Sequence, residues 1–314
     1  MSTPETRRAF LQIHFCVVLW GFTAILGKLI TLPALPLVWW RMLIVVAVIA
    51  LVPSVWRALR TMPARLVLAY SGIGVLVALH WLTFYASIKL SNASVGATCI
   101  ALGTVFTALV EPWLAKSKFQ PRDLLLGVAV LPGVALVVGG VPEGMRAGIA
   151  VGTLSALLVA LFGSLNKRLV EHGDALTVTG IELGAGTLAL TLLAPLMALL
   201  WPGEGLAFEL PSTRDSLYLL GLALGCTLLP YALSLVALRH MSAFAAQLAV
   251  NLEPVYAILL AIVLLGEQRE LTPQFYVGVA IILGAVLAYP LLHRLRRIEH
   301  PEMLAASESK GMVD

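Results

Sequence analysis

The stretches GVAVLPGVALV, which begins at Gly127, and GVAIILGAVLA, which begins at Gly278, are near copies of each other. A second pair keeps almost the same separation along the chain. FYASIKLSNASVGA, from Phe84, matches SLVALRHMSAFAAQ, from Ser234, in its pattern of apolar, polar and basic residues. The chain is therefore a tandem repeat of two halves of similar length, and a repeat of this period indicates a repetitive architecture.

Both halves are almost entirely apolar. The chain has 314 residues, of which 60% are hydrophobic and only 12% are charged, and its mean hydropathy is +0.94. A soluble domain of this length carries about 25% charged residues. A chain so poor in polar surface belongs in a bilayer, where only helices or closed barrels satisfy the backbone. The apolar runs are continuous and do not alternate, so helices are predicted.

Ten apolar segments have spanning length, and they fall at roughly 9–29, 36–56, 67–88, 93–115, 123–140, 148–166, 175–200, 215–238, 242–265 and 274–293. The predicted fold class is an all-α integral membrane protein of about ten transmembrane helices. The predicted units are a first five-helix repeat at 1–140, a second at 141–293 and a cytoplasmic tail at 294–314.

Basic residues predict the orientation of the two repeats. Of the 21 Lys and Arg residues, fifteen fall on the same side as the amino terminus, five fall on the other side, and Arg41 lies within a span. This bias predicts that both termini are cytoplasmic. Five spans per half is an odd number, so the second repeat is predicted to be inverted relative to the first. Repeat-equivalent cations then lie on opposite faces, Lys28 and Lys89 outside and Lys167 and Arg239 inside. Inverted repeats are the architectural basis of alternating access in transporters.

Two stretches resemble the EamA family of the drug/metabolite transporter superfamily. They are LWGFTAILGKLI, from Leu19, and SAFAAQLAVNLEPVYAILLAIVLLGE, from Ser242. The resemblance covers roughly 10–293 and implies ten helices, a central cavity between the halves, and movement of small polar metabolites, often outward, across a bacterial inner membrane. The glycine–glutamate pair that closes the family repeat stands as Gly266–Glu267 in the second half, whereas the first half reads LAKSK at that place.

Ionisable residues inside spans are the first candidates for function, because each costs about 2.5–3.5 kcal/mol at mid-span. Glu253 lies near the midplane and is followed by Pro254. We expect Glu253 to couple transport to protons by being protonated in one access state and ionised in the other. Arg41 and Glu182 lie nearer the interfaces and are interpreted as structural, snorkelling side chains. Glu111 is interpreted as an interfacial anchor.

Polar and aromatic faces of the spans predict a cavity for an amphipathic organic solute. Asn251 and Glu253 are about 200° apart on an ideal helix, so both face one cavity only if Pro254 distorts the turn. Ordinary interhelical hydrogen bonding explains the same faces equally well. The predicted substrate-binding residues are Trp20, Thr23, His80, Phe84, Thr227, Tyr231, Gln247 and Asn251.

The remaining chemistry-bearing residues predict no cofactor, no metal site and no nucleic-acid partner. The three cysteines lie in apolar runs without ligand spacing, and they are interpreted as small buried hydrophobes: Cys16, Cys99 and Cys226. The expected partners are the lipid bilayer, a small-molecule solute and protons. Glycine motifs that begin at Gly148, Gly180 and Gly221 are interpreted as sites of close helix packing, and a homodimer contact is left open.

The sequence thus predicts a secondary transporter that exports an amino-acid-like or similar amphipathic solute by alternating access. Uptake or antiport is an alternative within transport. An intramembrane enzyme is the alternative of another class, and a membrane scaffold or receptor is a third. No paired carboxylates or Ser–His arrangement appears at depth, which argues against an enzyme. All four aspartates lie in loops, at span edges or in the tail: Asp123, Asp174, Asp215 and Asp314.

Overall fold

The computed structural model describes residues 4–200 and 208–285, and these residues form helices with short connections and no strand. The helices are α1 (Pro4–Leu29), α2 (Ala34–Ala50), α3 (Pro53–Thr61), α4 (Ala64–Leu90), α5 (Ala93–Cys99), α6 (Gly103–Leu114), α7 (Pro121–Gly139), α8 (Arg146–Leu169), α9 (Ala175–Leu200), α10 (Thr213–Leu220), the π-helix η4 (Gly221–Leu228), α11 (Leu229–Leu238), α12 (Ala243–Val250) and α13 (Glu253–Leu265). The short turns are η1 (Ile100–Leu102), η2 (Glu143–Met145) and η5 (Glu267–Arg269), and a last described helix is Pro273–Ala285.

The described helices are those of a multi-pass membrane protein, as predicted. Seven of the described helical segments are long and apolar enough to cross a membrane, and the bent pair α2–α3 makes an eighth if it is counted as one span. Two apolar helices, Gly127–Gly139 within α7 and Pro273–Ala285, are shorter than this criterion requires. The count of ten is therefore not reached by length and composition alone. The predicted tail 294–314 lies outside the described residues.

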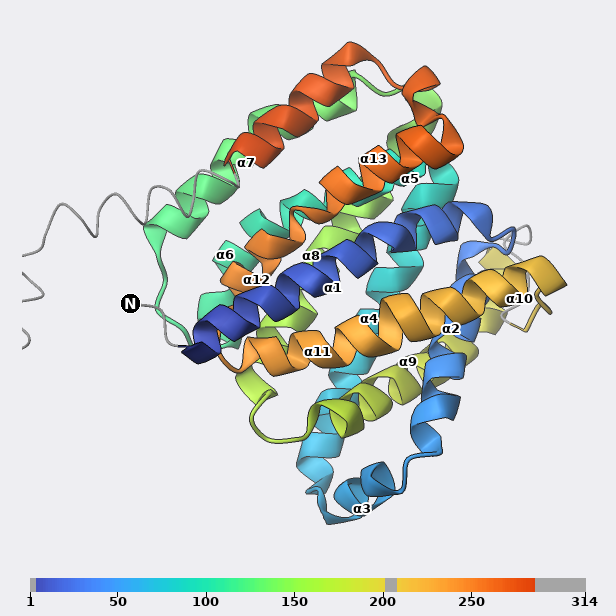
Figure 1. Cartoon of the computed structure of the whole chain (residues 1–314), viewed down its shortest axis with the longest axis vertical. Coiled ribbons are helices and arrows are strands. Elements are labelled where there is room, and N and C mark those ends of the chain that lie inside the picture. Colours follow the sequence, from blue (N-terminus) through green and yellow to red (C-terminus); the bar gives the residue numbers. More distant parts are fainter. Residues whose placement is uncertain (1–3, 201–207, 286–314) are drawn as a thin grey trace, which may run out of the picture.

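The predicted span 36–56 is wrong at its end. Helix α2 stops at Ala50, and α3 begins at Pro53 after a bend of 90°. Val52 has an extended backbone, with φ −94° and ψ 107°. A proline restricts the residue before it to this conformation and is favoured at the first position of a new helix. Figure 1 shows α3 at one edge of the molecule, where it contacts α9 and the end of α2.

Glycines set the closest helix contacts. A Cβ atom on Gly74 of α4 would lie only 2.0 Å from the carbonyl oxygen of Glu182 in α9, so only glycine fits there. A Cβ on Gly133 of α7 would lie 2.6 Å from the carbonyl oxygen of Gly278, and these two helices lie side by side in Figure 1. Backbones that approach this closely allow tight packing between membrane helices.

The three predicted glycine motifs behave differently from one another. A Cβ on Gly148 would meet Ser91 at 2.8 Å, and one on Gly180 would meet Ile49 at 3.0 Å, so both lie in tight contacts. By contrast, nothing among the described residues lies within 4 Å of a Cβ on Gly221, so its predicted packing role is wrong. The predicted burial of the cysteines is confirmed for all three, which are free.

Four cations at the two ends of the bundle bind backbone carbonyl groups near helix ends. The contacts are Lys28 Nζ with Ser91 O at 3.5 Å, Lys89 Nζ with Ile30 O, Lys167 Nζ with Leu238 O at 2.7 Å, and Arg239 Nη2 with Gly173 O at 2.8 Å. Cations in these positions neutralise carbonyl groups that have no partner within their own helix. The contacts tie the ends of separate spans together.

Glu111 has a structural role that the sequence interpretation missed. Its side chain is 5% exposed, and its two carboxylate oxygens accept the first two backbone N–H groups of α12, from Ala243 at 2.9 Å and Phe244 at 2.7 Å. A carboxylate at a helix N-terminus accepts otherwise unpaired donors and interacts favourably with the helix dipole. The interpretation of Glu111 as an interfacial anchor was therefore wrong.

Glu267 makes the matching contact at the start of α5. Its carboxylate accepts the backbone N–H groups of Ala93 and Ser94, each at 3.0 Å, and the Ser94 hydroxyl donates to it at 2.6 Å. Glu267 is 2% exposed. The glutamate that closes the second family repeat therefore caps a helix in the first half of the chain.

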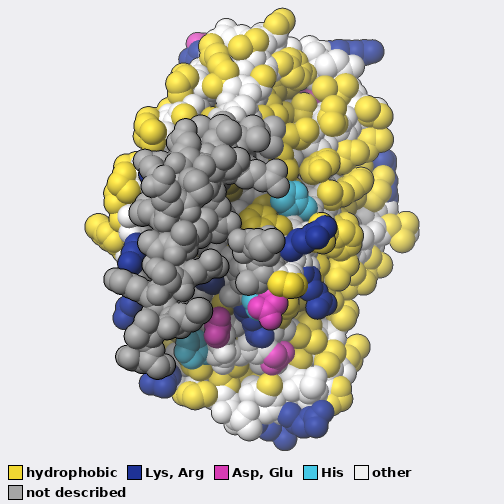
Figure 2. Space-filling model, turned by 60° about the vertical axis from the view of Figure 1, so that its left-hand side comes forward, with side chains coloured by type: hydrophobic (Ala, Val, Ile, Leu, Met, Phe, Trp, Pro, Cys, Tyr) yellow, Lys and Arg dark blue, Asp and Glu magenta, His cyan; other side chains and the backbone are white. Residues whose placement is uncertain are grey.

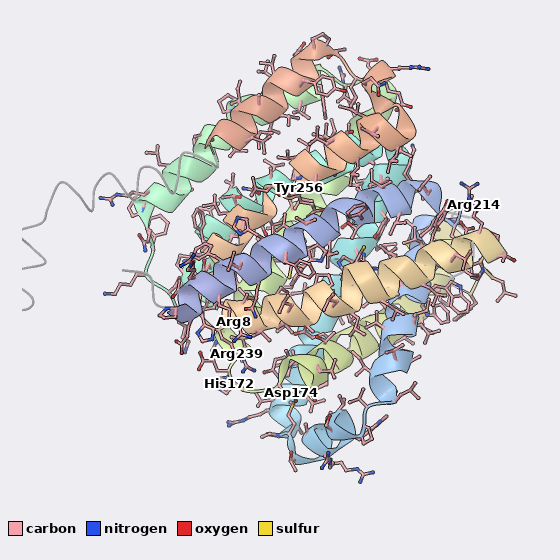
Figure 3. The ribbon with its side chains drawn as sticks, viewed as in Figure 1. Arg8, His172, Asp174, Arg214, Arg239 and Tyr256 are labelled. Atoms are coloured by element: carbon pink, nitrogen blue, oxygen red, sulfur yellow. The ribbon has the colours of Figure 1, made fainter. Side chains whose placement is uncertain are left out.

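The charged ends of the bundle flank an apolar surface. In Figure 2 much of the visible surface is hydrophobic, most of the acidic side chains gather in the lower half, and basic side chains lie beside them and also at the edges of this face. Figure 3 places Arg8 and Arg239 at one end of the helices and Arg214 at the other. This arrangement fits a bundle whose two ends face water on opposite sides of a bilayer.

The two ends can be distinguished by labelling. We expect Arg8→Cys and Arg214→Cys, each in a background lacking the three native cysteines, to react with an impermeant thiol reagent from opposite sides of the membrane, because both side chains are exposed at opposite ends. The charge bias predicts that Arg214→Cys reacts in intact cells and Arg8→Cys only after lysis. Labelling of both from one side would contradict the arrangement.

Candidate solute site

A cavity of about 120 Å³ lies inside the bundle and is lined by α1, α2, α4, η1, α8, α11, α12 and the first residue of α13. Its walls therefore come from both halves of the chain. Seven of the residues predicted to bind solute or couple transport line it, and they are Trp20, Thr23, His80, Phe84, Tyr231, Gln247 and Glu253. Residues more than 200 positions apart in the sequence are thus brought to one site.

Two predicted binding residues do not line the cavity. The Thr227 hydroxyl accepts a hydrogen bond from Arg41 Nε at 2.5 Å and donates to Leu222 O at 2.7 Å, within the π-helix. Asn251 is fully buried, and its amide donates to the Thr104 hydroxyl. The break between α12 and α13 leaves Asn251 facing α6 while Glu253 faces the cavity. Pro254 marks this break, as predicted, but it does not turn both side chains to one site.

Arg41 lines the cavity, although the sequence interpretation had it reaching the interface. It is 2% exposed, and its Nη1 donates to the Tyr85 hydroxyl at 2.9 Å in addition to the bond from Nε to Thr227. Its guanidinium carbon lies 3.9 Å from the ring centroid of Trp81, a cation–π contact. No carboxylate among the described residues lies within 4 Å of it. A buried cation held by neutral groups is available to bind an anion.

Glu253 is the acidic counterpart of Arg41 in the same cavity. It is 6% exposed and has no hydrogen-bond partner among the described residues. It interacts electrostatically with Arg41, but the two groups do not form a salt bridge. A buried carboxylate without partners is costly unless it binds a ligand or a proton. The cavity therefore holds one acidic and one basic group that do not neutralise each other directly.

His80 and its neighbours form an aromatic wall. The His80 ring nitrogen Nδ1 lies 2.8 Å from the Ser155 hydroxyl and 2.9 Å from the Ser155 carbonyl, which fixes the ring. The ring stacks on Phe84, with centroids 6.3 Å apart, and contacts Phe162 at 5.4 Å. Gln247 Nε2 makes a single 3.4 Å contact with Ile100 O. The wall is largely apolar with a few fixed polar groups, which is typical of sites for small organic ligands.

Sequence reasoning placed Trp81 on the same predicted face as His80 and Phe84 but did not choose it as a binding residue, and it missed Arg41 and the α8 wall. In the predicted span 36–56, Arg41 lies within about two turns of one end, where a long side chain can snorkel, whereas α2 as observed begins at Ala34 and places Arg41 near its middle. The sequence did contain one signal for a buried Arg41. It is the only charged residue in its predicted span, and a cation inside a span needs a partner. Phe162 and Gly163 carry no polar group that would mark α8 as a wall of the cavity.

The model of the EamA-like transporter family matches this chain twice, at residues 8–139 and at residues 146–289. The chain belongs to the EamA-like transporter family. Membership of this family makes it a membrane transporter, and the resemblance to the EamA family seen in the sequence is confirmed.

Relatives and solved structures agree with this EamA-like assignment. An uncharacterised transporter of Pseudomonas aeruginosa is 26% identical over 96% of this chain and 100% of its own length. An uncharacterised transporter of Clostridium kluyveri is 26% identical over 71% of each chain. A protein of known crystal structure matches with a TM-score of 0.66 over 92% of this chain and 98% of its own, at 17% identity, and it shows the fold alone.

Gln247 and Asn251 test which face of α12 lines the cavity of this EamA-like transporter. In the cysteine-free background we expect Gln247→Cys to react with a small membrane-permeant thiol reagent and Asn251→Cys to stay unreactive, because only Gln247 lines the cavity. Labelling is measured by mass spectrometry of the purified protein in detergent. Equal reactivity at the two positions would contradict the described orientation of α12.

Proposed function

We propose that this protein is a secondary transporter that moves a small amphipathic metabolite of amino-acid type across the membrane by alternating access. The observation that carries the proposal is the pair of buried, opposite charges in one cavity, Arg41 and Glu253, neither of which is bound to a charged side chain. Outward movement is the direction that the family resemblance favours.

The chemistry of the cavity fits a zwitterion with an apolar body. The guanidinium of Arg41 suits a solute carboxylate, since it offers planar, charge-assisted donors. Glu253 suits the ammonium group of the same solute. The rings of Trp20 and Phe84 provide the apolar surface that such a site needs.

The proposed architecture has ten spans in two inverted repeats, at 1–140 and 141–293. Seven long spans, the bent pair α2–α3 and the two shorter apolar helices account for ten. The family model matches once in each half. Repeat-equivalent cations also make equivalent contacts, since Lys28 and Lys167 each bind a carbonyl near the end of a long helix. Inversion of the repeats explains why these contacts lie at opposite ends.

The proposed location is a bacterial inner membrane, with both termini in the cytoplasm. The distribution of Lys and Arg supports this orientation, with fifteen of the 21 on the amino-terminal side. Under this orientation, α3 with its exposed Arg57 and Arg60 lies along the cytoplasmic surface.

The proposed coupling uses Glu253. A carboxylate that lines the cavity and has no hydrogen-bond partner can exchange a proton with whichever side the cavity faces. Protonation in one access state and ionisation in the other would tie movement of the solute to movement of protons. Uptake and antiport use the same site and differ only in the direction of the gradients.

Arg41→Gln tests the site. We expect cells overexpressing the parent protein to change the external level of at least one amino-acid-type metabolite, and Arg41→Gln to remove that change because the anion partner is lost. Metabolites in the medium and in the cells are compared by mass spectrometry. Arg146→Gln, which alters an exposed arginine paired with Glu143, is the matched control and should behave as the parent does. An unchanged metabolite profile on parent overexpression would contradict transport of such a metabolite, and an active Arg41→Gln would move the site elsewhere.

Glu253→Gln tests the coupling, because glutamine has a similar shape and cannot ionise. In vesicles containing the metabolite identified above, we expect this variant to retain exchange between labelled and unlabelled solute. It should lose accumulation driven by an imposed pH gradient. Accumulation equal to that of the parent would remove Glu253 as the proton carrier. If neither protein responds to the gradient, facilitated diffusion or antiport is left.

A further inference from the structure

A second buried carboxylate, Glu182 of α9, lies behind one wall of the cavity. It is fully buried, and its Oε2 accepts the Tyr231 hydroxyl at 2.5 Å and the Asn166 amide Nδ2 at 3.4 Å. Tyr231 also lines the cavity, so one residue contacts both the cavity and this carboxyl group. The close contact between Gly74 and the backbone of Glu182 fixes α9 in this position.

Two oxygens of this cluster have no donor. Oε1 of Glu182 and Oδ1 of Asn166 are both buried and unpaired. If the carboxyl group is ionised, two buried acceptor oxygens that have no donor carry a large desolvation cost. One proton on Oε1 would change it into a donor, and the acceptor that we assign to it is the unpaired Oδ1 of Asn166, whose amide already contacts the carboxyl group. The neutral acid and the amide then form two hydrogen bonds with each other, and both oxygens are satisfied.

From this geometry we propose that Glu182 is a second proton-binding site, and that Tyr231 connects it to the solute cavity. The role in transport rests on the proposed proton-coupled function. The bound proton itself does not, because it follows from the unpaired oxygens alone.

In the described part of the chain, the surroundings of Glu182 contain no compensating cation. Among the described residues, no Lys, Arg or His lies within 4 Å of it. On α4, Tyr70 interacts electrostatically with both Glu182 and Arg239, and its hydroxyl donates to Leu169 O. On α11, Tyr231 is the titratable group in direct contact.

The other packed helices do not supply a charge either. On α2, Arg41 interacts electrostatically with Tyr85, Cys226 and Glu253, on the cavity side. On α3, Arg57 and Arg60 are exposed. On α8, the group in contact is the neutral Asn166. A metal ion in place of the proton would need several more oxygen ligands, and the described residues hold no group of three or more His, Cys, Asp or Glu side chains that could supply them.

A contact path joins the solute charge site to Glu182. The Tyr231 ring packs edge-on against Trp81, with centroids 5.9 Å apart, and Trp81 lies under the guanidinium of Arg41. A solute that displaces Trp81 or Tyr231 would change the hydrogen bond between Tyr231 and Glu182. Proton release from Glu182 would thus respond to occupancy of the cavity, independently of Glu253.

Infrared spectroscopy of the purified full-length protein in lipid vesicles, without any solute, tests the bound proton. Exposed carboxyl groups are ionised at neutral pH, so a protonated-carboxyl C=O band there reports buried acids. We expect the parent to show such a band, Glu182→Gln to lose one component of it, and Glu253→Gln to keep that component. A spectrum of Glu182→Gln identical to that of the parent would overturn the proposal.

Two further measurements keep the test decisive if Glu182→Gln fails to fold. Tyr231→Phe keeps the ring and removes the hydroxyl, so it should shift the Glu182 component by removing one hydrogen bond; no shift would overturn the connection to the cavity. Exchange of choline chloride for sodium chloride should leave the band unchanged, and its replacement by a carboxylate band would mean a cation site instead. Suppose that the parent shows the Glu182 band but that Glu182→Gln accumulates solute in pH-gradient vesicles as well as the parent does. This result would overturn the role of Glu182 in transport and leave it as a proton-binding site. Loss of gradient response in the parent would sink the proposed function alone.

Discussion

Unpaired backbone groups at helix ends are the constraint on which the rest of this structure depends. Among the spans built from consecutive short helices, α5–α6 and α12–α13 each begin with N–H groups that no helical carbonyl can accept. In a bilayer such groups need a partner from the protein. Glu267 accepts them for α5 and Glu111 for α12, so each half of the chain provides the carboxylate that caps a helix of the other half. Folding of either half therefore leaves one helix start unsatisfied until the other half packs against it.

The cavity depends on the same caps. Because Glu111 holds the start of α12, this helix lies with Gln247 toward the interior and Asn251 toward Thr104 of α6. The chain then breaks before Glu253, and α13 starts with the Glu253 side chain facing the cavity. Asn251 and Glu253 stay on different sides, as on an ideal helix, so that Asn251 packs against α6 and Glu253 lines the cavity. A continuous helix would bury Glu253 in helix packing if Gln247 kept its place.

The fold could be predicted from the sequence further than the site could. Continuous apolar runs and short polar connections located the helices, since a span needs about 20 apolar residues whatever its neighbours are. The bend at Pro53 was missed because apolar residues continue across it. Seven of nine proposed site residues line one cavity, because polar side chains in a span face the protein interior. Thr227 was misjudged because the π-helix turns its hydroxyl toward Arg41. Arg41 was misjudged because its rotamer and its packing decide whether the side chain reaches the interface or the interior, and the sequence does not display either. Contacts between distant glutamates and helix starts have no local signature at all.

The cavity and its wall contain two buried acidic groups, Glu253 and Glu182, and one buried basic group, Arg41. Arg41 faces Glu253 across the cavity, while Glu182 has only Tyr231 and Asn166. If all three groups were ionised, the interior would hold two negative charges and one positive charge, with no further cation in contact among the described residues. A low-dielectric interior disfavours that state strongly. One bound proton restores neutrality, and a zwitterionic solute leaves it unchanged, since it adds no net charge. With one proton bound, the interior has no net charge whether the cavity is empty or holds a zwitterion, so the proposed coupling requires a further proton that Glu253 binds in only one access state.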